Sequence, residues 1–266
     1  MYEQYWSLAD KPFRNTPDPH YFYFSRQHEE ALTRMLYAIT EGQGAMMLTG
    51  DYGCGKTLLS RSLLDELDPD RFEVALIPYP NLSGVELLQE ILLQFGYEAQ
   101  GLSKVELLHL LSDCLLDNHA RGCSTIIIVD EAQMVMDKMT MEEIRLLLNF
   151  QQDRKFYLTL VLMGQPELRE RVEEMPQLLQ RLSVRYHLRA FDEEDSEKYL
   201  AHRMAIAGGN GDIFTREAGR LIASAGEGVP RRMNNIADMS LMVGFGQRTP
   251  VVDENIVQQV ITDMDA

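Results

Sequence analysis

Apolar residues follow two different patterns along this chain. In the first two thirds, short and mostly apolar runs occupy residues 45–49, 72–78, 125–129 and 156–163, separated by segments in which apolar residues recur every three or four positions. Runs of this kind are typical of strands that are buried on both faces of a parallel sheet, and the longer spacing is typical of amphipathic helices. The alternation therefore predicts a three-layer α/β core.

The pattern changes near residue 192. From there on the strand signal disappears, and helical spacing is found at residues 196–207, 215–224, 231–243 and 254–264. This change predicts a small all-helical domain after the core.

The N-terminal segment has a pattern of its own. Ser25 can cap a helix that ends near Gly42, and residues 11–24 before it are rich in proline and aromatic side chains, as in an extended arm. The predicted domains are an N-terminal arm and helix packed on the core at residues 1–43, the core at 44–191, and the helical domain at 192–266.

Composition limits where the chain is expected to work. A hydrophobic content of 45% over 266 residues supports a real core, and runs such as residues 156–163 are far shorter than a membrane span. The first residues, MYEQYWSLADKPF, contain neither a basic leader nor an apolar signal core. We therefore expect a cytoplasmic protein without a transmembrane segment, with recruitment to the inner face of the membrane by a partner as an open alternative.

Charge and cysteine content argue against other classes. The formal net charge of −16 disfavours binding to DNA, although a local basic patch would still permit it. Cys54, Cys114 and Cys123 show neither CxxC spacing nor regular pairing, so we expect neither a zinc cluster nor a disulfide framework.

The segment GDYGCGKT at residues 50–57 matches the pattern G-x-x-x-x-G-K-[ST], between a predicted strand and a predicted helix. In this context glycines let backbone N–H groups approach phosphate oxygens, and the positive end of the helix is directed at them. Lys56 would reach the β- and γ-phosphates, and Thr57 would supply a hydroxyl to Mg²⁺. The predicted nucleotide-binding residues here are Gly50, Asp51, Tyr52, Gly53, Cys54, Gly55, Lys56, Thr57 and Leu58.

A second strand ends in two carboxylates. The run IIIV at residues 126–129 is followed directly by Asp130 and Glu131, at the edge where ligands bind in parallel sheets. Asp130 is predicted to hold the Mg²⁺ shell. Glu131, which points to the other side, is predicted to polarise the water that attacks the γ-phosphate.

Three other nucleotide-binding classes do not fit the sequence. The Asn-Lys-x-Asp and D-x-x-G motifs of a GTPase are absent. The segment LSGVE at residues 82–86 faintly resembles a transporter ATPase signature, but it lies far before Asp130 and lacks the second glycine. The DEAQ at residues 130–133 is also found in helicases, but two motor domains do not fit in this length.

Seven segments together resemble the AAA+ ATPases, more narrowly the ExeA or general secretion pathway protein A type, over nearly all of the chain. They are KPFRNTPDPHYFYFSRQHEEAL near the N-terminus, GDYGCGKT as Walker A, IIIVDEAQ as Walker B, LMGQPELRERV as sensor 1, LLQRLSVRYHLRAF as the arginine-finger segment, YLAHRMAIAGG as the start of the lid, and GEGVPRRMNNI as sensor 2. The resemblance implies a parallel sheet of five strands with a helical lid, ATP hydrolysis, and assembly into rings or filaments with the site between subunits.

The resemblance also implies roles for four further residues. Gln165 becomes the sensor 1 side chain, where Asn is commoner in AAA+ proteins, and Arg231 becomes the lid arginine that contacts the γ-phosphate and so belongs to the nucleotide site. Arg181 best matches the finger that a neighbouring subunit inserts, and Arg185 is the second candidate. All of these, with Lys56 and Glu131, are the predicted catalytic residues.

Three functional hypotheses follow. The first is a cytosolic ATPase with ATP and Mg²⁺ as cofactors, whose nucleotide-dependent assembly, such as a hexamer, drives a protein partner in a secretion, pilus or other envelope machine. The second, from the similar transposition ATPases, is a DNA-binding ATPase that recruits a transposase, which the acidic charge disfavours. The third is a nucleotide-gated scaffold without turnover, which the intact Glu131 and Gln165 disfavour.

Two features stay open at this stage. Cys54 would lie at a helix N-terminus, which favours a thiolate, although an incidental small residue is preferred over a redox switch. Met134, Met136, Met139 and Met141 would suit an adaptable partner surface, although packing in the core is the preferred interpretation.

Overall fold

The computed structural model describes residues 1–152, 155–209 and 212–264, and the chain divides into two compact units. The first, called the sheet unit below, comprises His28–Gly50 and Leu59–Leu188. The second, called the helical unit, comprises Met1–Gln27, Asp51–Leu58 and Arg189–Ala266.

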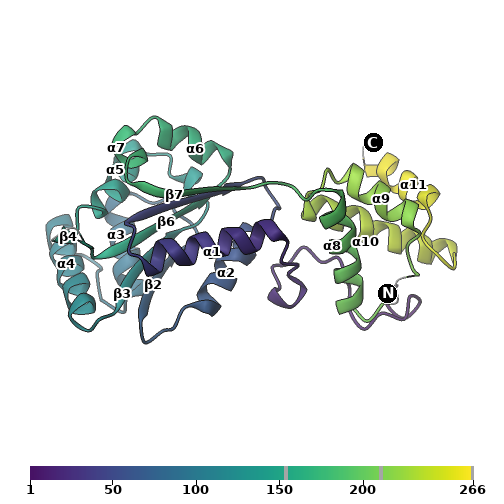
Figure 1. The fold of residues 1–266 in the computed structure, drawn as a ribbon, viewed down its shortest axis with the longest axis horizontal. Coiled ribbons are helices and arrows are strands. Elements are labelled where there is room, and N and C mark those ends of the chain that lie inside the picture. The colour runs from purple at the N-terminus through teal and green to yellow at the C-terminus, as the bar shows by residue number, and fades with distance from the viewer. Residues whose placement is uncertain (153–154, 210–211, 265–266) are drawn as a thin grey trace. The chain divides into compact units, whose positions relative to one another are not determined.

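A parallel sheet of five strands lies at the centre of the sheet unit (Figure 1), in the order β2-β3-β6-β1-β7. The strands are β1 Ala45–Gly50, β2 Phe72–Ile77, β3 Ser124–Val129, β6 Leu158–Gly164 and β7 Leu182–Leu188, with a short antiparallel pair of β4 Gln151–Gln152 and β5 Lys155–Phe156. Strands β1 and β6 are buried along their whole length, which is why their sequences are apolar at nearly every position. The predicted three-layer α/β core with its five-stranded sheet is confirmed.

Helices cover both faces of this sheet. They are α1 Arg26–Thr40, α2 Lys56–Glu66, α3 Gly84–Gln94, α4 Lys104–Ala120, α5 Lys138–Leu147, α6 Pro166–Glu173 and α7 Pro176–Leu179. Along β1, Ala45 and Met47 join the apolar cluster that contains side chains of α3 to α7. Met46 and Leu48 alternate with them along the strand, point to the opposite face and are also buried.

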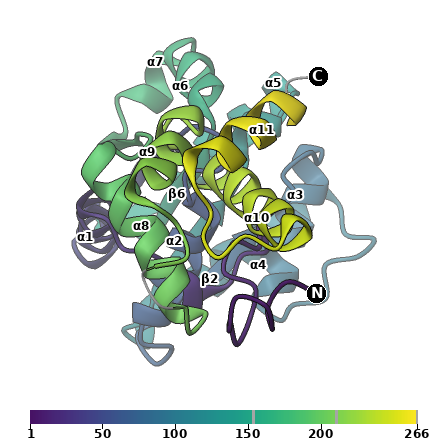
Figure 2. The ribbon, with the colours of Figure 1, turned by 90° about the vertical axis from the view of Figure 1, so that its right-hand side faces the viewer.

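The helical unit is built from four helices and the N-terminal arm. The helices are α8 Glu193–Ile206, α9 Arg216–Ala225, α10 Pro230–Gln247 and α11 Glu254–Met264, which Figure 2 shows gathered together. Their apolar faces share one core with the arm side chains of Trp6, Phe13 and Tyr21. No helix in the described part of the chain is both long and apolar enough to cross a membrane.

The N-terminal segment differs from its predicted packing. It was expected on the core as far as residue 43, but the arm up to Gln27 belongs to the helical unit, and only the rest of α1 belongs to the sheet unit. Besides the apolar side chains of the arm in this core, Arg203 of α8 holds the arm there, and this arginine is 5% exposed. Its guanidinium donates to the carbonyls of Pro12 (2.5 Å) and Arg14 (2.8 Å) and lies over the ring of Tyr21. A buried charge needs such partners, so the arm is held where the arginine lies.

Replacing Arg203 by methionine should destabilise the helical unit by about 2–4 kcal/mol, because the carbonyls of Pro12 and Arg14 lose charge-assisted hydrogen bonds from a buried guanidinium. The matched control is Arg220→Met. The ion pairs of Arg220 with Glu193 and Glu197 are exposed, so this variant should lose less than about 1 kcal/mol of stability. Urea unfolding followed by circular dichroism measures both changes. An equal loss of stability in the two variants would contradict the proposal that Arg203 holds the arm in place.

Candidate functional site

The glycine-rich loop follows β1 and leads into the first turn of α2. Gly53 and Gly55 have φ angles of 88° and 93°, a conformation that side chains other than glycine adopt only with strain. Lys56 begins α2, is 6% exposed, and donates from Nζ to the carbonyl of Asp51 at 3.0 Å. A bare loop, a helix N-terminus and a lysine folded over the loop together fit the phosphate groups of a nucleotide.

Arg231 lies beside this loop, within the helical unit. It is the second residue of α10, and its guanidinium lies over the ring of Tyr52, 4.4 Å from the centroid. The two backbones approach so closely that a Cβ atom on Gly53 would come within 2.7 Å of the Arg231 Cβ. The fold thus brings the predicted lid arginine next to the predicted phosphate loop, with a cation–π contact to Tyr52 that the sequence did not suggest.

Cys54 is buried inside the loop, at 2% exposure. Burial raises the pKa of its thiol to about 11, and the negative charge of Asp51 acts in the same direction. The suggestion that the helix N-terminus favours a thiolate is therefore wrong, because desolvation outweighs the helix and the nearby Lys56. Cys54 is a small core residue in the loop.

Asp130 and Glu131 follow β3 directly, as predicted from the sequence. Asp130 is 6% exposed, and its Oδ1 accepts the backbone N–H of Glu131 at 2.8 Å. Glu131 has a left-handed backbone (φ 49°, ψ 37°) and starts the short 3₁₀ helix η2 Ala132–Met134. This backbone is uncommon for a residue with a side chain, and such positions cluster at functional sites.

The side chain of Glu131 lies beside the end of β6. Strands β3 and β6 pair in parallel, with Val129 opposite Leu162, so the residues after both strands emerge at the same edge of the sheet. Gln165, the N-cap of α6, directs its Nε2 at Glu131 Oε2, 3.4 Å away. Sequence reasoning missed Gln133, which donates to the same Oε2. The sequence shows only a polar residue two positions after Glu131, and the structure adds that this residue is 7% exposed.

The two candidate finger arginines have different surroundings. Arg181 donates to the carbonyl of Leu148 at 2.6 Å and to Oδ1 of Asn149 at 3.0 Å, and so holds the C-terminal end of α5. Arg185 lies on the edge strand β7 with an exposed side chain. Arg181 thus has a structural task within its own chain, which Arg185 does not share.

The predicted metal ligands are Thr57 and Asp130. Thr57 is the second residue of α2 and is exposed. Within the described residues, no group of three or more His, Cys, Asp or Glu side chains is placed to hold a metal ion.

The methionines near α5 do not form the core cluster that the sequence favoured. Met141 is buried at 4% exposure, but Met134, Met136 and Met139 are 47%, 68% and 72% exposed. They lie on η2, the loop after it, and the first turn of α5, which present them to solvent. The preferred interpretation as core packing is wrong for these three residues.

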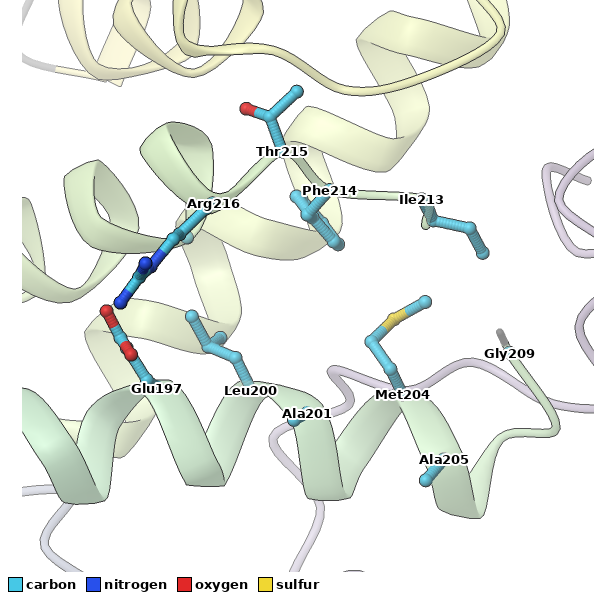
Figure 3. Close-up of a pocket in the computed structure, with 11 residues that line it drawn as sticks. Glu197, Leu200, Ala201, Met204, Ala205, Gly209, Ile213, Phe214, Thr215 and Arg216 are labelled. Atoms are coloured by element: carbon cyan, nitrogen blue, oxygen red, sulfur yellow. The ribbon is translucent and has the colours of Figure 1, made fainter. Parts of the chain in front are cut away.

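The helical unit also contains an apolar pocket of about 310 Å³ (Figure 3). Its walls come from α8 and from the segment leading into α9, with Glu197 and Arg216 facing each other at one end. None of the residues described in its lining is a predicted site residue.

Comparison with known proteins identifies the family of this chain. A family model described as "AAA domain" matches residues 39–172. General secretion pathway protein A of Aeromonas hydrophila is 38% identical over 251 residues, which is 93% of this chain. This chain spans 45% of the length of that protein.

Solved structures show the same fold at low sequence identity. The ORC2 protein of Aeropyrum pernix, in ADPNP and ADP complexes, superposes with a TM-score of 0.72 at 19% identity, covering 96% of this chain and 71% of that one. The Cdc6p of Pyrobaculum aerophilum gives a TM-score of 0.69 at 16% identity over 95% of this chain and 70% of its own. A Drosophila ORC chain from a complex with DNA gives a TM-score of 0.68 at 21% identity, covering 91% of this chain and 60% of that one.

Two substitutions should separate nucleotide binding from turnover. We expect Lys56→Ala to abolish binding of a fluorescent ATP analogue, because it removes the charge aimed at the phosphates. We expect Glu131→Gln to bind the analogue like wild type and to lose hydrolysis, because it removes only a proton acceptor. Equal affinity of wild type and Lys56→Ala would refute the phosphate-loop interpretation.

Cys54 should resist alkylation in the folded protein. Its raised pKa keeps the thiol protonated at about pH 7.5, and iodoacetamide reacts with the thiolate. Mass spectrometry should find Cys54 unlabelled until guanidinium unfolds the chain, whereas the partly exposed Cys123 should react earlier. Rapid labelling of Cys54 in the folded state would show that the loop opens.

Proposed function

This chain belongs to the AAA family of ATPases, and from that premise we propose that it hydrolyses ATP to control its own assembly and thereby drive a protein partner. The observation that carries the proposal is the contact between Glu131 and Gln165 at the ends of two adjacent strands. A scaffold that only binds nucleotide has no need for a carboxylate held by an amide at this position. An ATPase uses the carboxylate as the base and the amide to orient the reacting groups.

The proposed nucleotide contacts divide among a few residues. The loop of residues 50–58 would hold the phosphate chain, with Lys56 on the β- and γ-phosphates and Arg231 on the γ-phosphate. Mg²⁺ would be held by Thr57 and Asp130 together with phosphate oxygens, and it would neutralise the charge of the leaving group. The donor set fits, because a hydroxyl, a carboxylate and phosphates are all hard oxygen ligands.

Glu131 performs the proton step in this proposal. Its carboxylate accepts a proton from the attacking water, and Gln165 can donate to that water or to the γ-phosphate.

Assembly is needed because a neighbouring subunit is proposed to complete each site with an arginine. The exposed Arg185 suits this role better than Arg181, whose guanidinium is already used by Leu148 and Asn149. Such arginines contribute about 10³ to 10⁵ in rate where this has been measured.

The pathway is proposed from the relative whose name places it in general secretion. We assign the partner to a secretion, pilus or other envelope machine, with the protein in the cytoplasm and recruited to the membrane through that partner. The second candidate is a DNA-binding ATPase that recruits a transposase, and the DNA complex of the Drosophila relative is the observation in its favour. The net charge of −16 weighs against it.

Size measurement with a non-hydrolysable ATP analogue should distinguish these two candidates. We expect the protein to assemble with the analogue alone and to be unaffected by added DNA. Assembly that requires DNA and weakens steeply with salt would favour the second candidate, because phosphate contacts release counterions.

Activity should depend on protein concentration, because each site needs its neighbour. Specific ATPase activity should fall across a dilution series, and Arg185→Ala should bind ATP normally and lose hydrolysis. Mixing Arg185→Ala with Glu131→Gln should restore some turnover, since one mixed interface pairs an intact Glu131 with an intact Arg185.

Arg181→Ala is the matched comparison. We expect it to lower the melting temperature, because the end of α5 loses two hydrogen bonds, and to keep concentration-dependent activity. Rescue by Arg181→Ala in place of Arg185→Ala would move the finger to Arg181. Flat activity per subunit without any rescue would show that each site is complete within one chain.

A further inference from the structure

Gln133 lies between the proposed base and the end of the neighbouring strand. Its Nε2 donates to Oε2 of Glu131, and its Oε1 accepts the backbone N–H of Gln165 at 3.0 Å. The orientation of the amide is determined by its partners, because a backbone N–H only donates and a carboxylate only accepts. A flipped amide would lose both hydrogen bonds, so Gln133 fits this place in one orientation.

The end of β6 makes room for this side chain. A Cβ atom on Gly164 would lie 2.5 Å from Gln133 Oε1, closer than non-bonded atoms approach. Gln133 itself is 7% exposed, so its amide is largely removed from water and depends on these two partners. The hydrogen bond between Gln133 and the Gln165 N–H therefore needs two features, a glycine at the end of β6 and a buried amide after β3.

Glu131 is held at its backbone and at one carboxylate oxygen. Its N–H donates to Asp130, which stabilises the left-handed backbone, while the amides of Gln133 and Gln165 both donate to Oε2. Within the described residues, no side-chain hydrogen bond ends on Oε1 of Glu131, and in the proposed mechanism this oxygen accepts the proton from water.

We propose that Gln133 is a positioning residue for ATP hydrolysis, which holds Glu131 by Oε2 and couples it to the turn that carries Gln165. This inference rests on the proposed function, since it concerns the same carboxylate. In this role Gln133 acts through Glu131 and Gln165, to which its amide is hydrogen-bonded. A movement of the turn at Gln165 then changes where the carboxylate points, because one amide bonds to both.

Two substitutions of similar size separate the two hydrogen bonds of Gln133. Gln133→Met removes both the donor and the acceptor. Gln133→Glu keeps an acceptor for the Gln165 N–H but replaces the donor by a second carboxylate beside Glu131. When the introduced carboxyl is protonated it can again donate to Oε2, and the neighbouring negative charge raises its pKa.

The expected results concern kcat and its pH dependence. Gln133→Met should lower kcat about 10- to 100-fold, as the loss of an outer-shell partner does, with KM and analogue affinity within about threefold of wild type. Near neutral pH, Gln133→Glu should have a kcat as low as that of Gln133→Met. As the pH falls towards about 5.5, the ratio of its kcat to that of wild type should rise. Gln177→Met, on the exposed surface of α7, is the matched control and should behave like wild type.

Three outcomes would overturn the inference. They are a kcat of Gln133→Met within about twofold of wild type, a pH profile of Gln133→Glu parallel to wild type, and a loss that appears in KM alone. If Gln133→Met does not fold by circular dichroism, Gly164→Ala takes its place, with Leu168→Ala added to remove the side chain that the new methyl group would also meet, at 2.9 Å. The methyl group then displaces the Gln133 amide, so the double variant should have a lower kcat than Leu168→Ala alone, and an equal kcat would overturn the inference. Failure of wild type to hydrolyse ATP would instead count against the proposed function.

Discussion

The parallel pairing of β3 with β6 is the constraint on which the proposed chemistry depends. Because Val129 lies opposite Leu162, the residues that follow both strands emerge together at one edge. The two strands are buried almost throughout, so their register is fixed by many apolar contacts. A slip by one residue would turn buried side chains to the opposite face and would separate Glu131 from Gln165.

Most of the sheet could be predicted from the sequence, because a strand that is buried on both faces has to be apolar at nearly every position. Strand β7 could not be recognised in this way. As an edge strand it exposes Ser183, Arg185 and His187 in alternation, and only its end residues Leu182 and Leu188 are fully buried. The resemblance to a family implied the fifth strand, which the hydrophobic pattern of this segment alone did not reveal.

The position of the arm and the role of Gln133 could not be predicted from the sequence, because both depend on contacts between distant parts of the chain. The arm lies with the helical unit because Arg203, nearly two hundred positions away, needs its carbonyls. Gln133 acquires its importance from Gly164 and Gln165, which no local pattern connects with it. Cys54 is a further example. Its place at a helix end lowers the pKa of a thiol, but burial raises the pKa of Cys54 by more, and burial cannot be predicted from the local sequence.

The packing of the arm also determines how many N-terminal residues can be removed before the helical unit loses stability. An aromatic, proline-rich start before the first long helix resembles a dispensable tail, and trimming at residue 25 would leave every strand intact. That cut would remove Trp6, Phe13 and Tyr21 from the core of α8 to α11 and would leave the charge of Arg203 without its acceptors. The folded helical unit therefore needs residues of the arm, which lie ahead of residues 39–172, the segment that the AAA family model matches.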